Sequence, residues 1–443
     1  MKVEIKNRWL IVGGAILIQL ALGTIYAWSV FTKILTDPSG IYRFTATQTA
    51  CIFSAGLFTF ALVMVMSGKW LQKTTPRRVA ATGGVLLGAG YILAGLFGNT
   101  FITQLIFIGL IAGAGTGLAY VVPIAVGVKW FPDKKGLITG LSVAGFGFGA
   151  TIWVKLAGSW FGGLLNTTNI FGLPGTQSVF LIYGVVFTIL VLLGSLVMHN
   201  PPEGYAPEGW KPPAFTTSGS NPVGRIEFTP MEMLKTAQFY RLWVTFIFSA
   251  LAGLMVIYAI RLFGIDALES RGITNAGTIA GTAMAWYAIF NGLGRIVWGS
   301  ISDKMGRRNA IVAMTLLQCA VMLSIYHGFI MLGTTFGLIL GASIIGFNFG
   351  GNFALFPAAT ADFFGNKNVG SNYGWMFTAY GIAGILGPQI AGYYKDTASG
   401  INEPIVWMTP FIIAGIACLI GAIIMMTAPV PDLQKSELKL RKA

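Results

Sequence analysis

One cation lies deep in an apolar stretch of the sequence. Arg295 is the only charged residue in the run from Ile279 to Ser300, which is long enough to cross a bilayer as a helix. A guanidinium keeps its proton in proteins, and a charge at bilayer depth is costly unless it faces protein, water or an anion. No Asp or Glu lies in the middle of any comparable run. We therefore interpret Arg295 as the anchor for an anionic substrate of a membrane transporter.

Two polar residues share a helix face with this cation. In a helix, Asn291 lies one turn before Arg295 and Tyr287 lies two turns before it. A polar stripe of this kind fits a water-filled cavity better than lipid. The alternative is that Arg295 extends to the lipid headgroups, because it lies only about 8 Å from Ser300 along a helix axis.

Further candidate binding residues lie in the other apolar runs. Phenol and amide groups can donate hydrogen bonds to a carboxylate, and aromatic rings can shape the cavity wall. Ordinary helix packing explains each of these residues equally well, and amides in apolar spans also form interhelical hydrogen bonds. The candidates are Tyr26, Trp28, Tyr120, Phe349, Asn352, Phe353 and Tyr380.

Lys155 is a second cation inside an apolar run, and its role stays open between two interpretations. It lies between Trp153 and Trp160, so its side chain could extend to the interface beside an aromatic belt. In the other interpretation it attracts anions at the outer side of the membrane.

The composition is that of a membrane protein. Of 443 residues, 55% are hydrophobic and 10% are charged, with a net charge of +14. The basic residues lie in short segments between apolar runs, as in cytoplasmic membrane loops, so we expect a lipid bilayer and not nucleic acid as the partner. Metal-ligand spacing, a Ser/His/Asp set and a phosphate-binding glycine loop are missing from the sequence. We therefore expect neither an enzyme nor a bound metal or cofactor.

The apolar runs predict an all-α membrane protein with twelve transmembrane helices. A proline-rich polar segment after residue 199 cannot continue a helix. It predicts a six-helix half at 1–199, a cytoplasmic linker at 200–238, and a second six-helix half with a short basic tail at 239–443. The predicted spans are 9–31, 48–68, 79–98, 101–128, 136–160, 177–198, 240–263, 277–302, 309–327, 333–357, 370–393 and 405–427.

The distribution of Lys and Arg predicts the orientation. Basic residues gather in the loops at 69–78, 129–135 and 304–308 and in the tail at 435–442, all on the side of both termini, whereas the opposite loops carry few or none. By the positive-inside rule both termini are cytoplasmic. We expect an inner or plasma membrane location.

Two short sequences repeat at nearly one offset. Gly68–Arg78 corresponds to Gly299–Arg308, with the first glycines 231 residues apart, and Trp130–Gly136 corresponds to Phe363–Val369 at an offset of 233 residues. Such repeats indicate duplication of a six-helix unit. Duplicated halves commonly enclose a central site near the bilayer midplane.

The segment Gly299–Arg308 resembles the loop signature of the major facilitator superfamily. The resemblance implies that superfamily's fold of two pseudo-symmetric six-helix halves. It also implies gating roles for residues in the two loop copies, namely Arg77, Asp303, Arg307 and Arg308. The first copy departs from the signature, because Gln72 stands where the acid belongs and Pro76 where an Arg is usual.

Within the superfamily, the chain resembles the oxalate:formate antiporter family, a relative of the monocarboxylate transporters. The similar stretches are 22–31, 129–136, 233–239, 291–295, 349–357 and 372–374. The resemblance implies that Arg295 and Tyr120 bind substrate. Tyr380 stands where the oxalate transporter has a second cation, and Asn291 stands where related proton-coupled carriers have Asp. The first departure favours a substrate with one negative charge, and the second leaves the chain without an obvious membrane-embedded proton carrier.

Together these features predict a monomeric secondary transporter of small monocarboxylates such as lactate, formate or pyruvate. We expect it to work by alternating access and anion exchange. Proton-coupled symport, oxalate:formate exchange and a carrier-like membrane sensor remain as alternatives.

Overall fold

The computed structural model describes residues 7–37, 39–202, 205–207, 227–325, 333–397 and 404–428. The described chain is almost entirely helical, apart from an antiparallel two-stranded hairpin formed by β1 (Asn169–Ile170) and β2 (Leu173–Pro174). This confirms the predicted all-α class. Most of the predicted linker and the whole basic tail lie outside the described residues.

Helices before residue 200 form the N-terminal helix group. One of its crossings is interrupted by a 3-10 segment and another by a π-helical segment. The elements are α1 (Trp9–Leu22), η1 (Gly23–Ala27), α2 (Trp28–Leu35), α3 (Ala46–Lys73), α4 (Pro76–Phe97), α5 (Phe101–Gln104), η2 (Leu105–Ala112), α6 (Gly113–Trp130), α7 (Lys135–Gly158), η3 (Trp160–Gly162), α8 (Leu164–Thr167) and α9 (Thr176–Ser195).

Helices after residue 229 form the C-terminal helix group. The short α10 precedes six long crossings. The elements are α10 (Pro230–Met233), α11 (Ala237–Glu269), α12 (Ala276–Met305), α13 (Arg307–Ile325), α14 (Thr335–Phe364), α15 (Val369–Thr397), η5 (Pro404–Trp407) and α16 (Met408–Met426).

The twelve predicted spans each coincide with one helical crossing. Within the described residues, nine segments are long and apolar enough to cross a membrane, and α12, α13 and α15 complete the set of twelve. The predicted end of the seventh span at residue 263 is wrong, because α11 continues to Glu269. The extra turn brings the buried Asp266 within 2.8 Å of the half-buried Lys395, and this ion pair stabilises the turn.

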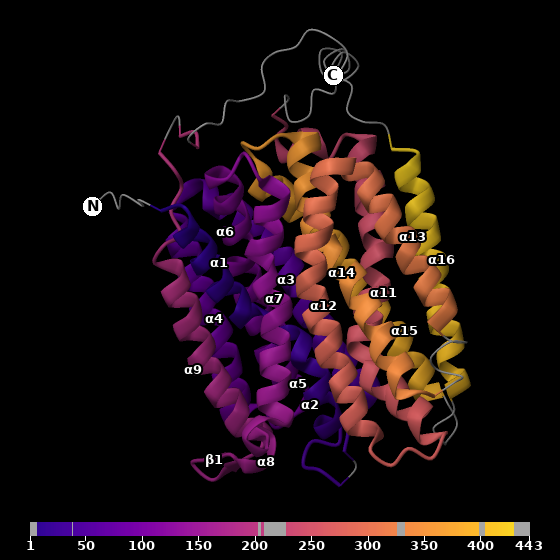
Figure 1. Ribbon diagram of the computed structural model, residues 1–443. Helices are drawn as coiled ribbons and strands as arrows, with labels where there is room; N and C mark the ends of the chain where they lie inside the picture. Colours follow the sequence, from indigo (N-terminus) through magenta and orange to yellow (C-terminus); the bar gives the residue numbers. More distant parts are fainter. Residues whose placement is uncertain are drawn as a thin grey trace.

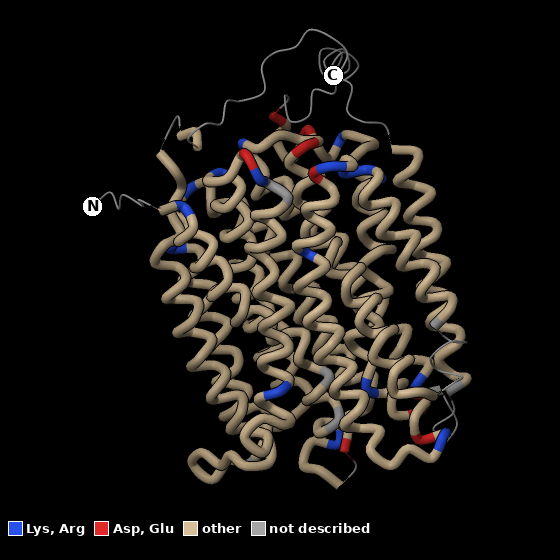
Figure 2. Tube along the Cα trace, in the orientation of Figure 1, with Lys and Arg blue, Asp and Glu red and all other residues tan. Residues whose placement is uncertain are grey.

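The two helix groups lie side by side, and α1 begins at the same face where α16 ends (Figure 1). We call this the terminal face, and the face that carries the β1–β2 hairpin the opposite face. The groups meet along a seam where α3 packs on α15 and α7 packs on α12. Figure 2 shows most of the charged residues at the terminal face and a smaller set near the opposite face.

Glycine allows an unusually close approach of α7 to α12. A Cβ atom at Gly147 would lie 2.6 Å from the backbone nitrogen of Gly292, and one at Gly140 would lie 2.5 Å from the carbonyl oxygen of Arg295. Real side chains do not tolerate such distances, so a larger residue would separate the helices. The close crossing brings the α7 backbone within reach of the Arg295 side chain.

Candidate functional site

Arg295 lies in the middle of α12 and is completely buried, with 0% of its surface exposed. Its Nε donates to Asn291 Oδ1 at 3.0 Å, and its Nη1 donates to the carbonyl oxygen of Val143 in α7 at 2.7 Å. Its Nη2 has no hydrogen-bond partner. None of the four ion pairs in the described part of the chain involves this guanidinium. The side chain is thus held across the seam with its charge unpaired and one nitrogen free.

Two aromatic rings stabilise this cation without neutralising it. The guanidinium carbon lies 4.2 Å from the ring centroid of Phe353 in α14 and 5.1 Å from that of Phe146 in α7. An aromatic face attracts a cation through its negative quadrupole. Phe353 was a predicted site residue, whereas Phe146 was missed. The glycines on either side of Phe146 could have indicated its place in the site, because they let α7 approach α12.

Three tyrosines complete the surroundings of the cation. The hydroxyl groups of Tyr26 in η1 and Tyr380 in α15 share a hydrogen bond of 2.9 Å across the seam. Tyr120 in α6 packs against Phe146, with ring centroids 5.7 Å apart, and its hydroxyl has no hydrogen-bond partner. Besides Phe353, the structure therefore brings together five predicted polar residues. We call them the central cluster, and they are Arg295, Asn291, Tyr26, Tyr120 and Tyr380.

Unfilled hydrogen-bond donors give the central cluster its chemical character. Asn291 Nδ2, Arg295 Nη2 and the Tyr120 hydroxyl are all buried without a partner. A buried donor without an acceptor costs about 1–3 kcal/mol, and more when it is charged. A carboxylate is an acceptor with two oxygens and a negative charge. It would satisfy the free donors and compensate the cation together.

Two other predicted residues lie around this cluster in different roles. Phe349 packs between Tyr26 and Tyr287, with ring centroids 5.8 and 6.2 Å away. Asn352 accepts from Ser249 Oγ at 2.7 Å and donates to the Phe349 carbonyl at 3.1 Å. Its amide thus makes the interhelical hydrogen bond that the sequence left open as an alternative to substrate contact.

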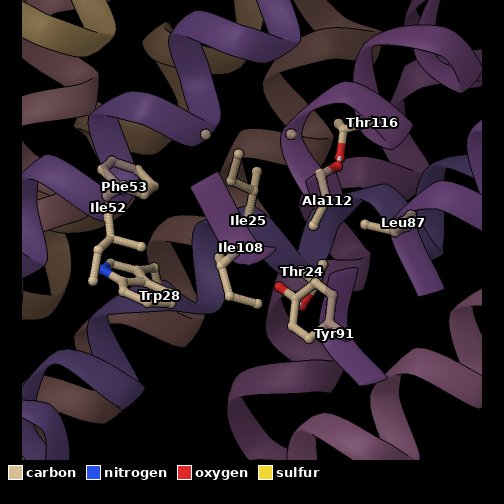
Figure 3. Close-up of a pocket in the computed structure, with 12 residues that line it drawn as sticks. Thr24, Ile25, Trp28, Ile52, Phe53, Leu87, Tyr91, Ile108, Ala112 and Thr116 are labelled. Atoms are coloured by element: carbon tan, nitrogen blue, oxygen red, sulfur yellow. Dashed lines mark hydrogen bonds between the residues drawn. The ribbon is translucent and has the colours of Figure 1, made fainter. Parts of the chain in front are cut away.

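Trp28 lines a separate cavity inside the N-terminal helix group (Figure 3). Its Nε1 donates to the carbonyl oxygen of Thr49 at 3.1 Å. On the other side of this cavity, the hydroxyls of Thr24 and Tyr91 lie 3.1 Å apart. The volume is about 20 Å³, which is enough for a water molecule but too small for an organic acid.

The loop copies at the terminal face hold the helices in different ways. In the second copy, Arg307 pairs with Asp303 at 2.7 Å and with Asp362 of α14 at 2.8 Å. In the first copy, Gln72 Nε2 donates to Ser371 Oγ of α15 at 2.9 Å. The substitution of the signature acid therefore leaves a neutral hydrogen bond across the seam. The sequence did not indicate Asp362, because its position beside Arg307 depends on tertiary packing.

The other two predicted gating residues make weaker connections. Arg308 donates to the carbonyl oxygen of Met426, which ties α13 to the end of α16. Arg77 is exposed and forms no ion pair with the described residues. These observations place an ionic connection in the C-terminal helix group at the terminal face.

The seam is closed at both faces. At the terminal face, a Cβ atom at Gly68 would lie 2.7 Å from the Gly370 carbonyl oxygen. At the opposite face, Thr47 donates to the Asp396 carboxylate, and the Tyr258 hydroxyl donates to the Ala46 carbonyl at 2.6 Å. The central cluster is thus sealed from both sides. The described residues contain no group of His, Cys, Asp and Glu that could hold a metal ion.

Comparison with known families decides the identity of this bundle. The family model described as Major Facilitator Superfamily matches residues 9–280 and 263–443. The chain belongs to the major facilitator superfamily. It is therefore a multi-pass membrane protein and a secondary transporter, and the predictions of the fold and of a carrier that is not an enzyme are confirmed.

Individual members of the superfamily are similar along most of the chain. The oxalate:formate antiporter of Oxalobacter formigenes is 27% identical over 98% of this chain and 94% of its own length. The apicoplast pyruvate carrier 1 of Toxoplasma gondii is 24% identical over 84% of this chain and 82% of its own length. These matches confirm the resemblance to the oxalate:formate antiporter family.

A solved superfamily structure shares the fold. The bacterial homologue of the human lysosomal transporter Spinster, in an inward-facing and unoccupied conformation, superposes with a TM-score of 0.67 at 14% identity. The match covers 98% of each chain. At this identity the likeness supports the arrangement of helices alone.

Proposed function

We propose that this carrier exchanges small monocarboxylates, such as formate, lactate or pyruvate, across the membrane. The observation that carries the proposal is the buried, unpaired guanidinium of Arg295, with Nη2 unfilled. A carboxylate bound there accepts a hydrogen bond from Nη2 and from the Tyr120 hydroxyl. The planar guanidinium matches the two oxygens of a carboxylate better than a point charge does.

One charge on the substrate matches one charge in the site. Within the central cluster Arg295 is the single cation, and Tyr380 contributes a neutral hydroxyl that is bonded to Tyr26. A second carboxylate would have to enter an aromatic environment without a cation to compensate it, which is costly at low dielectric. The relatives named for oxalate and formate and for pyruvate support a carboxylate substrate in general.

Two six-helix halves, 1–199 and 239–443, would move against each other around this site. The sealed seam corresponds to an occluded stage of alternating access. Opening at the terminal face would break the Gln72–Ser371 contact, and opening at the opposite face would break the Thr47–Asp396 contact. We infer that the terminal face is cytoplasmic, because the basic loops lie there, and that the protein works as a monomer in the inner or plasma membrane.

Counterflow in proteoliposomes tests the proposal. Vesicles loaded with unlabelled pyruvate should take up labelled pyruvate, and external formate, lactate and pyruvate should compete better than external oxalate. Empty liposomes control for passive entry of the protonated acid. Binding without flux would instead identify a membrane sensor, and strong preference for oxalate would contradict the one-cation argument.

A further inference from the structure

A second polar cavity opens near the opposite face, between α7, α11 and α12. Its volume is about 440 Å³, far more than the roughly 30 Å³ that one water occupies in the liquid. Hydroxyl groups of Ser159, Thr278 and Thr282 line it, together with the side chains of Lys155 and Arg261. We call this cavity the outer pocket. It is large enough for a hydrated organic acid.

The two cations come from opposite sides of the seam. Lys155 belongs to α7 in the N-terminal helix group, and Arg261 belongs to α11 in the C-terminal group. Both are half-buried, and neither forms an ion pair within the described residues. The Arg261 Nε atom is buried and has no hydrogen-bond partner. The outer pocket thus holds two positive charges without protein partners.

The acids near the outer pocket do not remove this positive character. Glu269 also lines the cavity and has an interaction of its own within the protein. Asp266 lies one turn earlier in α11, but its carboxylate accepts from Lys395 Nζ at 2.8 Å and from Trp407 Nε1 at 2.8 Å. The lining therefore contains two cations and one acid.

Of the two tryptophans near Lys155, Trp160 is exposed and Trp153 is not part of an aromatic belt. Trp153 is buried, donates from Nε1 to the Leu20 carbonyl at 2.7 Å, and packs on Tyr183 with ring centroids 5.3 Å apart. It is a packing residue of the N-terminal helix group. Lys155 itself lines the outer pocket.

The outer pocket is separate from the central cluster. Thr282 lies thirteen residues before Arg295 in α12, which corresponds to about 20 Å along the helix axis. Between them, Thr151 Oγ of α7 donates to the Ala285 carbonyl at 3.3 Å and closes the α7–α12 crossing. An anion in the outer pocket therefore has to wait for the helices to part before it reaches Arg295.

We propose that the outer pocket is a loading site that captures the transported monocarboxylate from the side opposite the termini. The inference rests on the proposed function, since it assumes that the same anion continues to Arg295. Two unpartnered cations in one cavity raise the local concentration of anions and their rate of entry, and salt weakens this effect. Because the cations belong to different helix groups, the bound anion also links the two groups at this face.

The test compares Lys155→Gln, Arg261→Gln and the double variant with Lys304→Gln, which removes an exposed charge at the terminal face. Initial uptake of labelled pyruvate is measured in vesicles of defined orientation at low and high salt. For substrate presented at the opposite face, we expect the double variant to lower kcat/KM by about threefold to tenfold at low salt. High salt should reduce this difference, and Lys304→Gln should have no effect.

A second readout does not depend on transport. Purified Arg295→Gln protein, in which the central site is disabled, should retain weak, salt-sensitive binding of formate, and addition of the Lys155→Gln and Arg261→Gln changes should abolish it. Unchanged kcat/KM together with unchanged formate binding in the double variant would overturn the loading site. An equal loss from both membrane faces would also overturn it, because it would indicate a structural role.

These outcomes separate the loading site from the proposed function. If the double variant behaves like wild type while Arg295→Lys loses transport, the loading site is wrong and the central site stands. If wild-type protein transports no carboxylate, the proposed function is wrong whatever the outer pocket binds.

Discussion

The two helix groups share a repeated sequence pattern but differ in how they use charge. The C-terminal group carries the buried cation Arg295 and the ionic connection from Arg307 to Asp303 and Asp362. The N-terminal group faces them with neutral groups, including the free Tyr120 hydroxyl and the Gln72 amide. At the central cluster the C-terminal group thus supplies the charge and the N-terminal group supplies neutral partners, although the N-terminal group keeps an ion pair of its own between Arg8 and Asp133 at 2.9 Å.

This asymmetry has a consequence for the transport cycle. If Arg295 moves with the C-terminal group, the substrate charge is carried by that group, while the N-terminal group contributes hydrogen bonds and aromatic surface. The empty site retains an unpaired positive charge that is costly inside the bilayer. A monoanion neutralises it, so the loaded carrier should reorient more readily than the empty one.

The largest effect is expected from Arg295→Lys. Lysine keeps the positive charge but loses the planar fork that holds Asn291 and the Val143 carbonyl and that, in the proposed function, also binds the substrate. Loss of one charged hydrogen bond corresponds to roughly 1.5–3 kcal/mol, so we expect pyruvate counterflow to fall by about tenfold to 100-fold. Arg78→Lys, at an exposed position of the terminal face, is the matched control. Near-normal counterflow in Arg295→Lys would remove this residue from the centre of the site.

The sequence predicted those helices and site residues that depend on local residue patterns. Long apolar runs determined the twelve crossings, and helical periodicity placed Asn291 and Arg295 on one face. Family resemblance favoured Tyr120 and Tyr380, and Tyr26 was a candidate as an aromatic residue of an apolar run; the structure brings all three to the same cluster. Trp28 follows η1, the 3-10 interruption of the first crossing, and lines a separate cavity instead of joining the cluster.

Other contacts of the site could not be predicted, because they depend on tertiary packing and not on a local residue pattern. The Val143 carbonyl becomes a partner of Arg295 only because glycines let α7 approach α12. Asp362 lies in an apolar stretch far along the chain from Arg307, and only packing of α14 brings them together. Arg261 was not recognised as a candidate site residue, because the predicted seventh span ended at residue 263, whereas α11 continues to Glu269.

The second-largest effect is expected for substrate preference when Tyr380, a neutral residue of the central cluster, is replaced. Tyr380→Lys introduces the cation that the central cluster lacks, so preference should shift from pyruvate toward oxalate by about tenfold, equivalent to roughly 1.4 kcal/mol. Competition of both acids against labelled pyruvate measures the shift. Tyr380→Phe is the control, because it removes the hydrogen bond to Tyr26 without adding charge. An unchanged ratio in Tyr380→Lys would show that residue 380 does not select substrate charge.

A third effect compares the two connections at the terminal face. Asp362→Asn weakens a half-buried ion pair, whereas Gln72→Ala removes one neutral hydrogen bond of about 0.5–1.5 kcal/mol. We expect Asp362→Asn to lower the melting temperature and reduce counterflow by about threefold to tenfold, and Gln72→Ala to change counterflow by less than about threefold. Thermal unfolding of the purified carrier and counterflow measure both variants. Equal effects would mean that the charge asymmetry of the two loop copies has no role in gating.

The smallest expected effect is that of a pH gradient. Asn291 occupies the position next to Arg295 and cannot carry a proton, and Asp266 is held by Lys395 and Trp407 near the opposite face. Reorientation of the empty carrier with an unpaired charge is costly, so exchange should be much faster than net efflux. An imposed gradient should change uptake by less than about twofold, once the entry of protonated acid into protein-free liposomes has been subtracted.

Uphill, protein-dependent uptake that is driven by an inward proton gradient alone, with no internal anion, would contradict the exchange mechanism. In that case Asp266→Asn would be the next variant to measure, because loss of the gradient effect would identify its carboxylate as the proton carrier.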